Sequence, residues 1–224
     1  MLCLTVFTTL VLTLFLSPIS CHPAPTGHTG IWFRNEHPLD QYLSVDFAEK
    51  DMAAHPDLVA QDMTIAATEH IFLPMRPGMS PKFFLSPTPN NRSAEVGDKR
   101  DSDTAVEVTF AGFQGHTYYD VDIERGFSVP VWCYGYDQDW EDGSGCLADL
   151  LDGCPEHLKH FDESSGMHDQ CLGDGSEASV MRRRKMCPQV YVQSDDEQTR
   201  AQVGAPGKIQ SPLPMKHWVD RLIT

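Results

Sequence analysis

Short runs in which apolar and polar residues alternate fill the middle of the chain, and turn-forming residues separate them. The clearest run spans residues 105–113, where Val106 and Val108 alternate with Glu107 and Thr109. A period of two residues is typical of a strand that buries one face and leaves the other in solvent. We therefore predict a β-strand here.

The other predicted strands share this alternation or are rich in aromatic and branched residues, and they span residues 31–46 with a break at Pro38, 64–73, 82–85, 118–123, 127–134 and 189–193. Residues 48–62 are open between a short helix and an exposed loop. Turn and loop residues dominate 74–81 and 86–103. Short strands at this spacing favour a mainly β fold with a β-sandwich core.

The character of the chain changes after Tyr134, where it becomes polar, acidic and rich in cysteine. One helix is predicted here, from Leu147 towards Lys159. We expect a small disulfide-stapled lobe at residues 137–186, inserted into the sandwich. The predicted organisation is therefore a core of residues 31–136 and 187–197, this lobe, and a C-terminal tail of residues 198–224.

The N-terminal segment is apolar and uncharged, and residues 1–20 have the length of a secretory signal peptide. Cleavage is open between positions after Ser20, Cys21 and Ala24, and residues 22–30 are expected to be a loose leader. No later stretch is apolar enough to cross a bilayer. We therefore expect a secreted, extracellular glycoprotein, with Asn91 in its Asn-Arg-Ser sequon as the candidate glycosylation site.

The chain carries a formal charge of −15, from 32 acidic and 17 basic residues. Such a surface repels nucleic acid and anionic lipid, so neither is expected as a partner. The acids are concentrated at residues 137–174. Two interpretations of this region stay open: a solvated face that keeps the protein soluble, and a surface that faces carbohydrate or cations.

The common catalytic and metal-binding motifs are absent from the sequence. It contains no Gly-x-Ser-x-Gly, no His-Glu-x-x-His and no phosphate-binding loop. The cysteines lack the Cys-x2-Cys spacing of zinc sites, and the acids after Asp137 do not match a calcium-binding EF-hand. We therefore expect no metal and no cofactor.

Seven cysteines are present, of which Cys3 lies in the predicted leader and Cys21 at its boundary. The remaining five are Cys133, Cys146, Cys154, Cys171 and Cys187. Four of them can form two bridges in three ways, and their spacing does not choose between these pairings.

Three sequence blocks occur in a fixed order: Tyr-Tyr-Asp-Val-Asp-Ile-Glu-Arg-Gly-Phe-Ser-Val-Pro at 118–130, Cys-Leu-Ala-Asp-Leu-Leu-Asp-Gly-Cys-Pro at 146–155, and Cys-Pro-Gln-Val-Tyr at 187–191. Together they resemble the thaumatin-like (osmotin-like, pathogenesis-related) family. The resemblance is strongest over 107–154 and 187–196. It is to a divergent member with a reduced set of cysteines, of the fungal type.

The resemblance implies a thaumatin-like β-sandwich with a small disulfide-stapled lobe of loops and one helix. It also implies the pairs Cys146–Cys187 and Cys154–Cys171. Cys133 is then left over, and three states stay open for it: a free thiol, a bond to Cys21, or a link between two chains.

Many members of this family have an acidic cleft built from one Arg, one Glu and three Asp. Carried over position by position, Glu107 matches the Glu and Asp120 the first Asp, while the second falls on Arg125, a reversal of charge. The remaining positions fall on Lys82 for the Arg and on Asp195 or Asp196 for the third Asp. Among the aromatic residues, Tyr136 and Trp140 are the best surface candidates for contact with a sugar, because acids surround them.

The expected function is binding of a cell-wall polysaccharide, such as a β-1,3-glucan, through this acidic cleft. One alternative is a weak endo-β-1,3-glucanase with Glu107 and Asp120 as its catalytic carboxyls, which requires both to face the cleft from neighbouring strands. A cation at Arg125 opposes a protonated general acid nearby. The other alternative is a secreted effector that binds a host protein.

Overall fold

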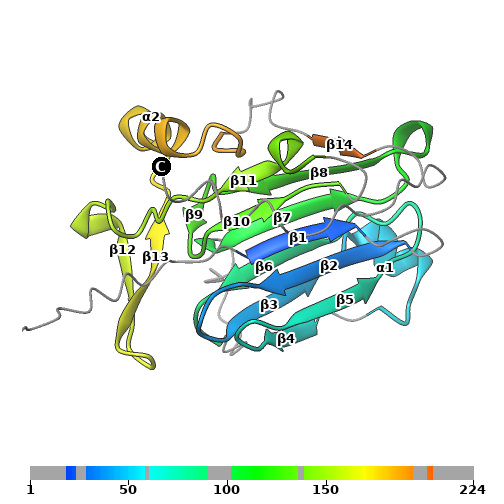
Figure 1. Cartoon of the computed structure of the whole chain (residues 1–224), viewed down its shortest axis with the longest axis horizontal. Coiled ribbons are helices and arrows are strands. Elements are labelled where there is room, and N and C mark those ends of the chain that lie inside the picture. The colour runs from blue at the N-terminus through cyan, green and yellow to red at the C-terminus, as the bar shows by residue number, and fades with distance from the viewer. Residues whose placement is uncertain are drawn as a thin grey trace, which may run out of the picture.

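The computed structural model describes residues 19–23, 29–58, 61–89, 102–135, 139–193 and 201–203, with the backbone alone at 21–23, 140 and 201–203. Within these residues the protein is mainly β, with three sheets, two short α-helices and two disulfides whose partners are both described. Figure 1 shows the smaller lobe, which carries β12, β13 and α2, beside one end of the larger stacked sheets.

The larger sheet has six strands in the order β14-β8-β7-β6-β3-β4. These strands span Ala201–Val203 (β14), Thr117–Asp122 (β8), Thr104–Thr109 (β7), Lys82–Ser86 (β6), Gln41–Asp46 (β3) and Gln61–Ile65 (β4). A short helix, α1 (Glu49–Ala54), follows β3. All the strand pairs are antiparallel, which lets one face stay in contact with solvent while the other is buried.

The second sheet has five strands in the order β11-β10-β1-β2-β5. They span Ser144–Cys146 (β11), Val131–Cys133 (β10), Ile19–Pro23 (β1), Gly30–Asn35 (β2) and His70–Pro74 (β5). The two sheets pack face to face, as the edge-on contact between the rings of Phe33 in β2 and Phe83 in β6 shows, with centroids 5.1 Å apart. Val106 and Val108 point into this core, so Glu107 and Thr109 between them point outwards.

Strand β1 lies where the sequence predicted a leader. It is inserted between β10, to which it is parallel, and β2, to which it is antiparallel. Ile19 is 1% exposed and packs in the core, which explains why this segment joins the sheet. The register places residue 21 opposite Cys133, and Cys133 is disulfide-bonded.

Cleavage after Ser20 would remove Ile19 and Ser20 from this strand. We expect a chain that begins at Cys21 to unfold with a free energy about 2–4 kcal/mol lower than one that begins at Pro18, because a buried branched side chain and two strand pairs are lost. Urea denaturation of the two chains measures the difference. Equal midpoints would mean that β1 contributes nothing to the fold.

Two other predicted strands are each divided in the structure. The stretch 64–73 holds the end of β4 and most of β5, which belong to different sheets. The buried Asn35 side chain donates to the carbonyls of Ile65 and Ala66 at 3.0 and 3.2 Å and fixes the turn between them. The stretch 127–134 splits into β9 (Gly126–Phe127), which pairs with the lobe, and β10 in the sandwich.

The predicted helix from Leu147 to Lys159 is wrong. Turns and a 3-10 helix, η4 (Glu156–Leu158), occupy this region and lead into the hairpin of β12 (Lys159–Asp162) and β13 (Met167–Leu172). The side chain of Asp149 accepts from the amide of Leu151 and favours a turn rather than a helix. Cys154 is then tied to β13 by its disulfide.

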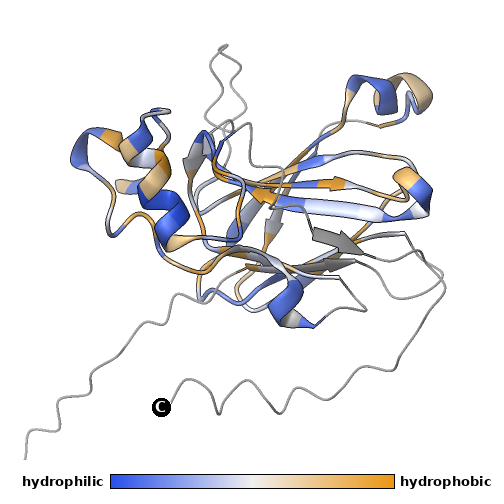
Figure 2. Ribbon diagram, turned by 90° about the horizontal axis from the view of Figure 1, so that it is seen from above, coloured by the Kyte–Doolittle hydropathy of each residue, from blue (hydrophilic) through white to orange (hydrophobic). Residues whose placement is uncertain are grey.

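The lobe helix is α2 (Glu177–Met186), which the sequence analysis did not predict. Ser176 caps it by accepting from the amide of Ser179 at 3.2 Å. Glu177 lies in its first turn and basic residues in its last, as the helix dipole favours. The helix was missed because the basic run Arg182–Lys185 fills most of its second half, and Figure 2 colours much of it hydrophilic.

Two disulfides tie the lobe together, and their pairing is the one that the resemblance implies. Cys146 of β11 is bonded to Cys187 at the end of α2, with Cα atoms 4.9 Å apart. Cys154 is bonded to Cys171 of β13, with Cα atoms 5.8 Å apart. No helix within the described residues is long and apolar enough to cross a membrane.

Candidate functional site

A row of four charged residues crosses the outer face of the six-stranded sheet. Asp46 on β3 lies opposite Lys82 on β6, Lys82 opposite Glu107 on β7, and Glu107 opposite Asp120 on β8. Residues that are directly opposite in a sheet share a face, so the four side chains emerge on the same side. The row extends over three strand spacings, or about 14 Å.

Lys82 is the cation at the centre of this row. Its Nζ lies 2.7 Å from Oε1 of Glu107 and 3.0 Å from Oδ2 of Asp122, the next outward residue of β8. Partial burial of the ammonium opposes its charge, but the charges and hydrogen bonds of Asp122 and Glu107 outweigh this effect and raise the pKa of Lys82. The lysine therefore stays charged at neutral pH, and its own charge is already matched by two carboxylates.

A second row, of uncharged polar residues, lies beside the first. Tyr118 of β8 is opposite Thr109 of β7, and the hydroxyl of Thr109 is 3.2 Å from that of Ser80. Asp51 of α1 holds Ser80 in place by accepting from its amide at 2.7 Å. The outer face thus presents hydroxyls next to carboxylates.

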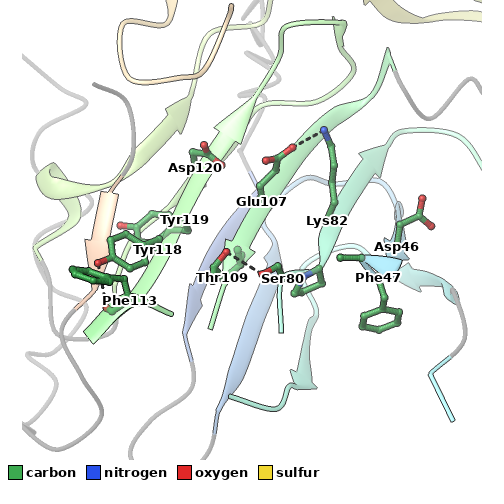
Figure 3. Close-up of a pocket in the computed structure, with 13 residues that line it drawn as sticks. Asp46, Phe47, Ser80, Lys82, Glu107, Thr109, Phe113, Tyr118, Tyr119 and Asp120 are labelled. Carbon is green, nitrogen blue, oxygen red and sulfur yellow. Dashed lines mark hydrogen bonds and ion pairs between the residues drawn. The ribbon is translucent and has the colours of Figure 1, made fainter. Parts of the chain in front are cut away.

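These two rows line a cavity of about 750 Å³ (Figure 3). Aromatic side chains lie at its two ends, with Phe47 after β3 and Phe113 in the turn between β7 and β8. A cavity of this size accommodates a small ligand or a segment of a polymer. Its lining combines carboxylates, hydroxyls and aromatic rings, which suits a ligand with many hydroxyl groups and some apolar surface.

The segment that follows the lobe pairs with the end of the acid-bearing strand β8. Tyr191 lies four residues after Cys187 and forms two backbone hydrogen bonds with the end of β8. Its amide donates to the carbonyl of Val121 at 2.8 Å, and its carbonyl accepts from the amide of Ile123 at 2.9 Å. Burial, followed by the charges of Glu124 and three other carboxylates, raises the pKa of Tyr191. A negative field therefore extends from the site to this edge of the sheet.

None of the described residues at 139–186 lines the cavity. The site is thus a feature of the sheet and its loops, whereas the family resemblance implies a cleft between sandwich and lobe. The reason is that the acid-bearing strands turn their polar face away from the core, whereas the described residues at 139–186 pair with β9 and β10 and, through Arg183, contact the chain just after β8.

The structure brings together three of the predicted site residues: Lys82, Glu107 and Asp120. Arg125 is exposed in the turn after β8 and does not line the cavity, whereas Lys82 lines it and contacts Glu107 and Asp122. Four further predictions lie outside the described part of the chain: Tyr136, Asp195, Asp196 and Asn91. Trp140 begins the 3-10 helix η3 (Trp140–Asp142), and its side chain is likewise not described.

The sequence analysis missed several site residues, among them Asp46, Asp122, Phe47 and Phe113. Asp122 could have been found, because it lies two residues after Asp120 in the same predicted strand and must share its face. Asp46 could not, because its position opposite Lys82 depends on strand register. Phe113 was counted as the end of a strand.

The site offers hydrogen-bond acceptors rather than a metal centre. Among the described residues there is no group of three or more His, Cys, Asp or Glu side chains arranged to hold a metal ion. Lys82 occupies the position between Glu107 and Asp122 that a cation would need. The chemistry of the site is therefore that of carboxylates and hydroxyls that accept from, and donate to, a polar ligand.

No protein-family model matches the chain, and a comparison with curated proteins finds no match either. The protein is therefore classed by its own features, as a mainly β, disulfide-bonded protein with an acid-lined cavity on the outer face of its larger sheet.

Proposed function

We propose that this is a secreted protein of the thaumatin-like type that binds a cell-wall polysaccharide, such as a β-1,3-glucan, in the acid-lined cavity. The observation that carries the proposal is the charged row across four strands, which faces a cavity of about 750 Å³. Carboxylates accept strong hydrogen bonds from sugar hydroxyls, and an open groove admits a polymer.

Two other features support the thaumatin-like assignment. The lobe carries the cysteine pairs that the family resemblance implies, and it inserts between strands of a sandwich. Disulfides of this kind persist in oxidising compartments, which supports secretion.

The test is retention of the purified protein on insoluble β-1,3-glucan, with affinity for soluble laminarin measured by titration calorimetry. We expect the Glu107→Gln, Asp120→Asn double variant to bind laminarin at least about tenfold more weakly, because two charge-assisted acceptors are lost. Both replacements keep the side-chain shape, so the thermal midpoint separates a loss of binding from a loss of folding.

The matched control is Glu163→Gln, an exposed acid in the turn of the lobe hairpin, which should bind as the original protein does. Failure of the unaltered protein to bind any β-glucan would overturn the proposal. Specific capture of a secreted or cell-surface protein in its place would favour the effector alternative.

Weak hydrolysis of the same glucan is a second candidate function, and one observation favours it. Glu107 and Asp120 are directly opposite on neighbouring strands and share a face, with Cβ atoms about 5 Å apart, so two carboxyls project side by side into the cavity as a glycosidase requires. Retaining enzymes use one of the two carboxyls as the nucleophile, and Glu107, which is held by Lys82 at 2.7 Å, is the candidate for that role. Release of reducing ends from laminarin, abolished by Glu107→Gln, would distinguish an enzyme from a binding protein.

A further inference from the structure

The side chain of Phe113 is the most exposed large apolar group among the described residues, at 75% exposure. It belongs to the 3-10 turn η2 (Phe113–Gly115), which joins β7 to β8. The same side chain lines the acid-lined cavity at the end nearest β8 (Figure 3). A phenylalanine in this position loses the favourable burial that its ring would have in the core.

The backbone of this turn is strained. Ala111 and Gln114 both have positive φ angles, of 46° and 56°, a conformation that non-glycine residues rarely adopt. Such residues cost on the order of 1–3 kcal/mol each and persist only where the surroundings hold them.

Hydrogen bonds hold the strained turn in one shape. The amide of Gly112 donates to the carbonyl of His116 at 2.7 Å, and the amide of Gly115 donates to the carbonyl of Gly112 at 3.0 Å. The hydroxyl of Tyr118 donates to the carbonyl of Phe113 at 3.3 Å, which links the turn to the polar row of the cavity. The ring of Phe113 is thus presented by a fixed backbone, beside Tyr118 and on the side of the site away from Lys82.

The neighbourhood of Phe113 matches one class of ligand chemistry. A pyranose ring with equatorial hydroxyls has two apolar C–H faces and a polar rim, so it can lie flat on an aromatic ring while its hydroxyls bond to carboxylates at the side. Phe113 supplies the flat apolar surface, and Tyr118, Thr109 and Asp120 supply polar groups within the same cavity. A ligand without apolar faces would gain nothing from the exposed ring.

We propose that Phe113 is a stacking platform, on which the apolar face of a glucosyl residue of the bound chain rests while its hydroxyls face the charged row. This inference rests on the proposed function, and it adds the residue that would select a flat, equatorial sugar over other polyhydroxy ligands. The strain of the turn is then the cost of holding the ring in place before the ligand arrives, which reduces the entropy lost on binding.

The experiment compares Phe113→Ala, Phe113→Trp and the control Met181→Ala, which removes a side chain that is 60% exposed on α2, away from the cavity. Laminarin affinity is measured by titration calorimetry for each. We expect Phe113→Ala to bind laminarin about tenfold more weakly, because the aromatic contact with the sugar is lost. Its thermal midpoint should be unchanged, because Phe113 makes no contact in the core. Phe113→Trp should bind at least as well as the original protein.

A spectroscopic readout accompanies the affinities. The chain has four other tryptophans, so ligand-induced emission changes are compared between Phe113→Trp and the original protein, and the difference reports position 113 alone. We expect a shift on addition of laminarin and none on addition of mannitol, a flexible polyol with no ring.

The outcomes separate this inference from the proposed function. If Phe113→Ala binds laminarin normally while the Glu107→Gln, Asp120→Asn variant does not, the cavity is the binding site and Phe113 is not a stacking platform. If Phe113→Ala loses affinity and the double variant does not, the platform stands and the acidic row is not the site. If the original protein binds no β-glucan, both are overturned.

Discussion

Replacing Cys146 and Cys187 together with alanine should lower the free energy of unfolding by about 4 kcal/mol, and replacing Cys154 and Cys171 by about 3 kcal/mol. The bonds close segments with sequence separations of 41 and 17 residues. A longer closed loop restricts the unfolded chain more, so its loss has the larger effect. Urea denaturation of the two double variants measures both values.

The two variants should also differ in where the native state loosens. Cys187 is close in sequence to Tyr191, which pairs with the end of β8, while Cys154 lies in a turn remote from that strand. Amide hydrogen exchange at Ile123 and Tyr191 should therefore rise in the Cys146→Ala, Cys187→Ala variant and change less in the other. Equal exchange at these two amides in both variants would contradict the role assigned to the Cys146–Cys187 bond.

The alternation in the sequence was enough to predict the centre of the larger sheet. β7 and β8 occur where the period of two placed them, with Glu107 and Asp120 on the face opposite Val106 and Val121. Local periodicity fixes which residues share a face of one strand. It could not fix which residues lie opposite each other, because strand register is set by long-range pairing. The contact of Lys82 with Asp122 as well as Glu107 therefore appears only in the structure.

The errors arise where a tertiary contact overrides a local pattern. The segment 64–73 looks like one strand, but the buried side chain of Asn35, about thirty residues away in the chain, bonds to its backbone and makes it turn. Likewise, Ile19 reads as part of an apolar leader, and only the gap between β10 and β2 makes it a core residue. Neither contact can be recognised from the sequence of the segment alone.

The lobe helix shows a different limit. α2 has no apolar stripe for a periodicity argument to find, and its start and stop signals at Ser176 and in the basic last turn were the only evidence available. Besides the Cys146–Cys187 bond, a buried cation attaches it to the sandwich: Arg183, in the basic run Arg182–Lys185. Burial of one arginine beside three basic neighbours cannot be predicted from composition.

Replacing Arg183 with alanine should lower the free energy of unfolding by about 3 kcal/mol. Arg183 is 2% exposed, and its Nη1 donates to the carbonyls of both Ile123 and Glu124, directly after β8. Its removal leaves these two buried acceptors without their donor and opens a cavity. Breaking the contacts of a buried charge usually costs about 3–5 kcal/mol of stability. We expect a loss near the lower end, because Nε and Nη2 of Arg183 have no hydrogen-bond partner in the described part of the chain.

The charge of Arg183 matters as well as its hydrogen bonds. Burial, followed by repulsion from Arg182, lowers the pKa of Arg183 to about 10, while Asp174 and Asp122 oppose this shift. The guanidinium is therefore still charged at neutral pH, and it acts as a counter-charge to the acidic end of β8. Arg183→Lys keeps that charge but not the two-carbonyl geometry, so we expect it to recover only part of the lost stability.

Lys185→Ala is the matched control, because it removes an exposed cation from the same helix turn and should change stability by less than about 0.5 kcal/mol. Arg183→Met distinguishes the two causes, since it fills most of the volume and restores neither the donor nor the charge. If the Arg183→Met variant is as stable as the original protein, Arg183 contributes to stability only by filling the volume. If the Arg183→Met variant loses as much free energy of unfolding as Arg183→Ala, the hydrogen bonds and the charge of Arg183 attach the lobe to the acid-bearing strand.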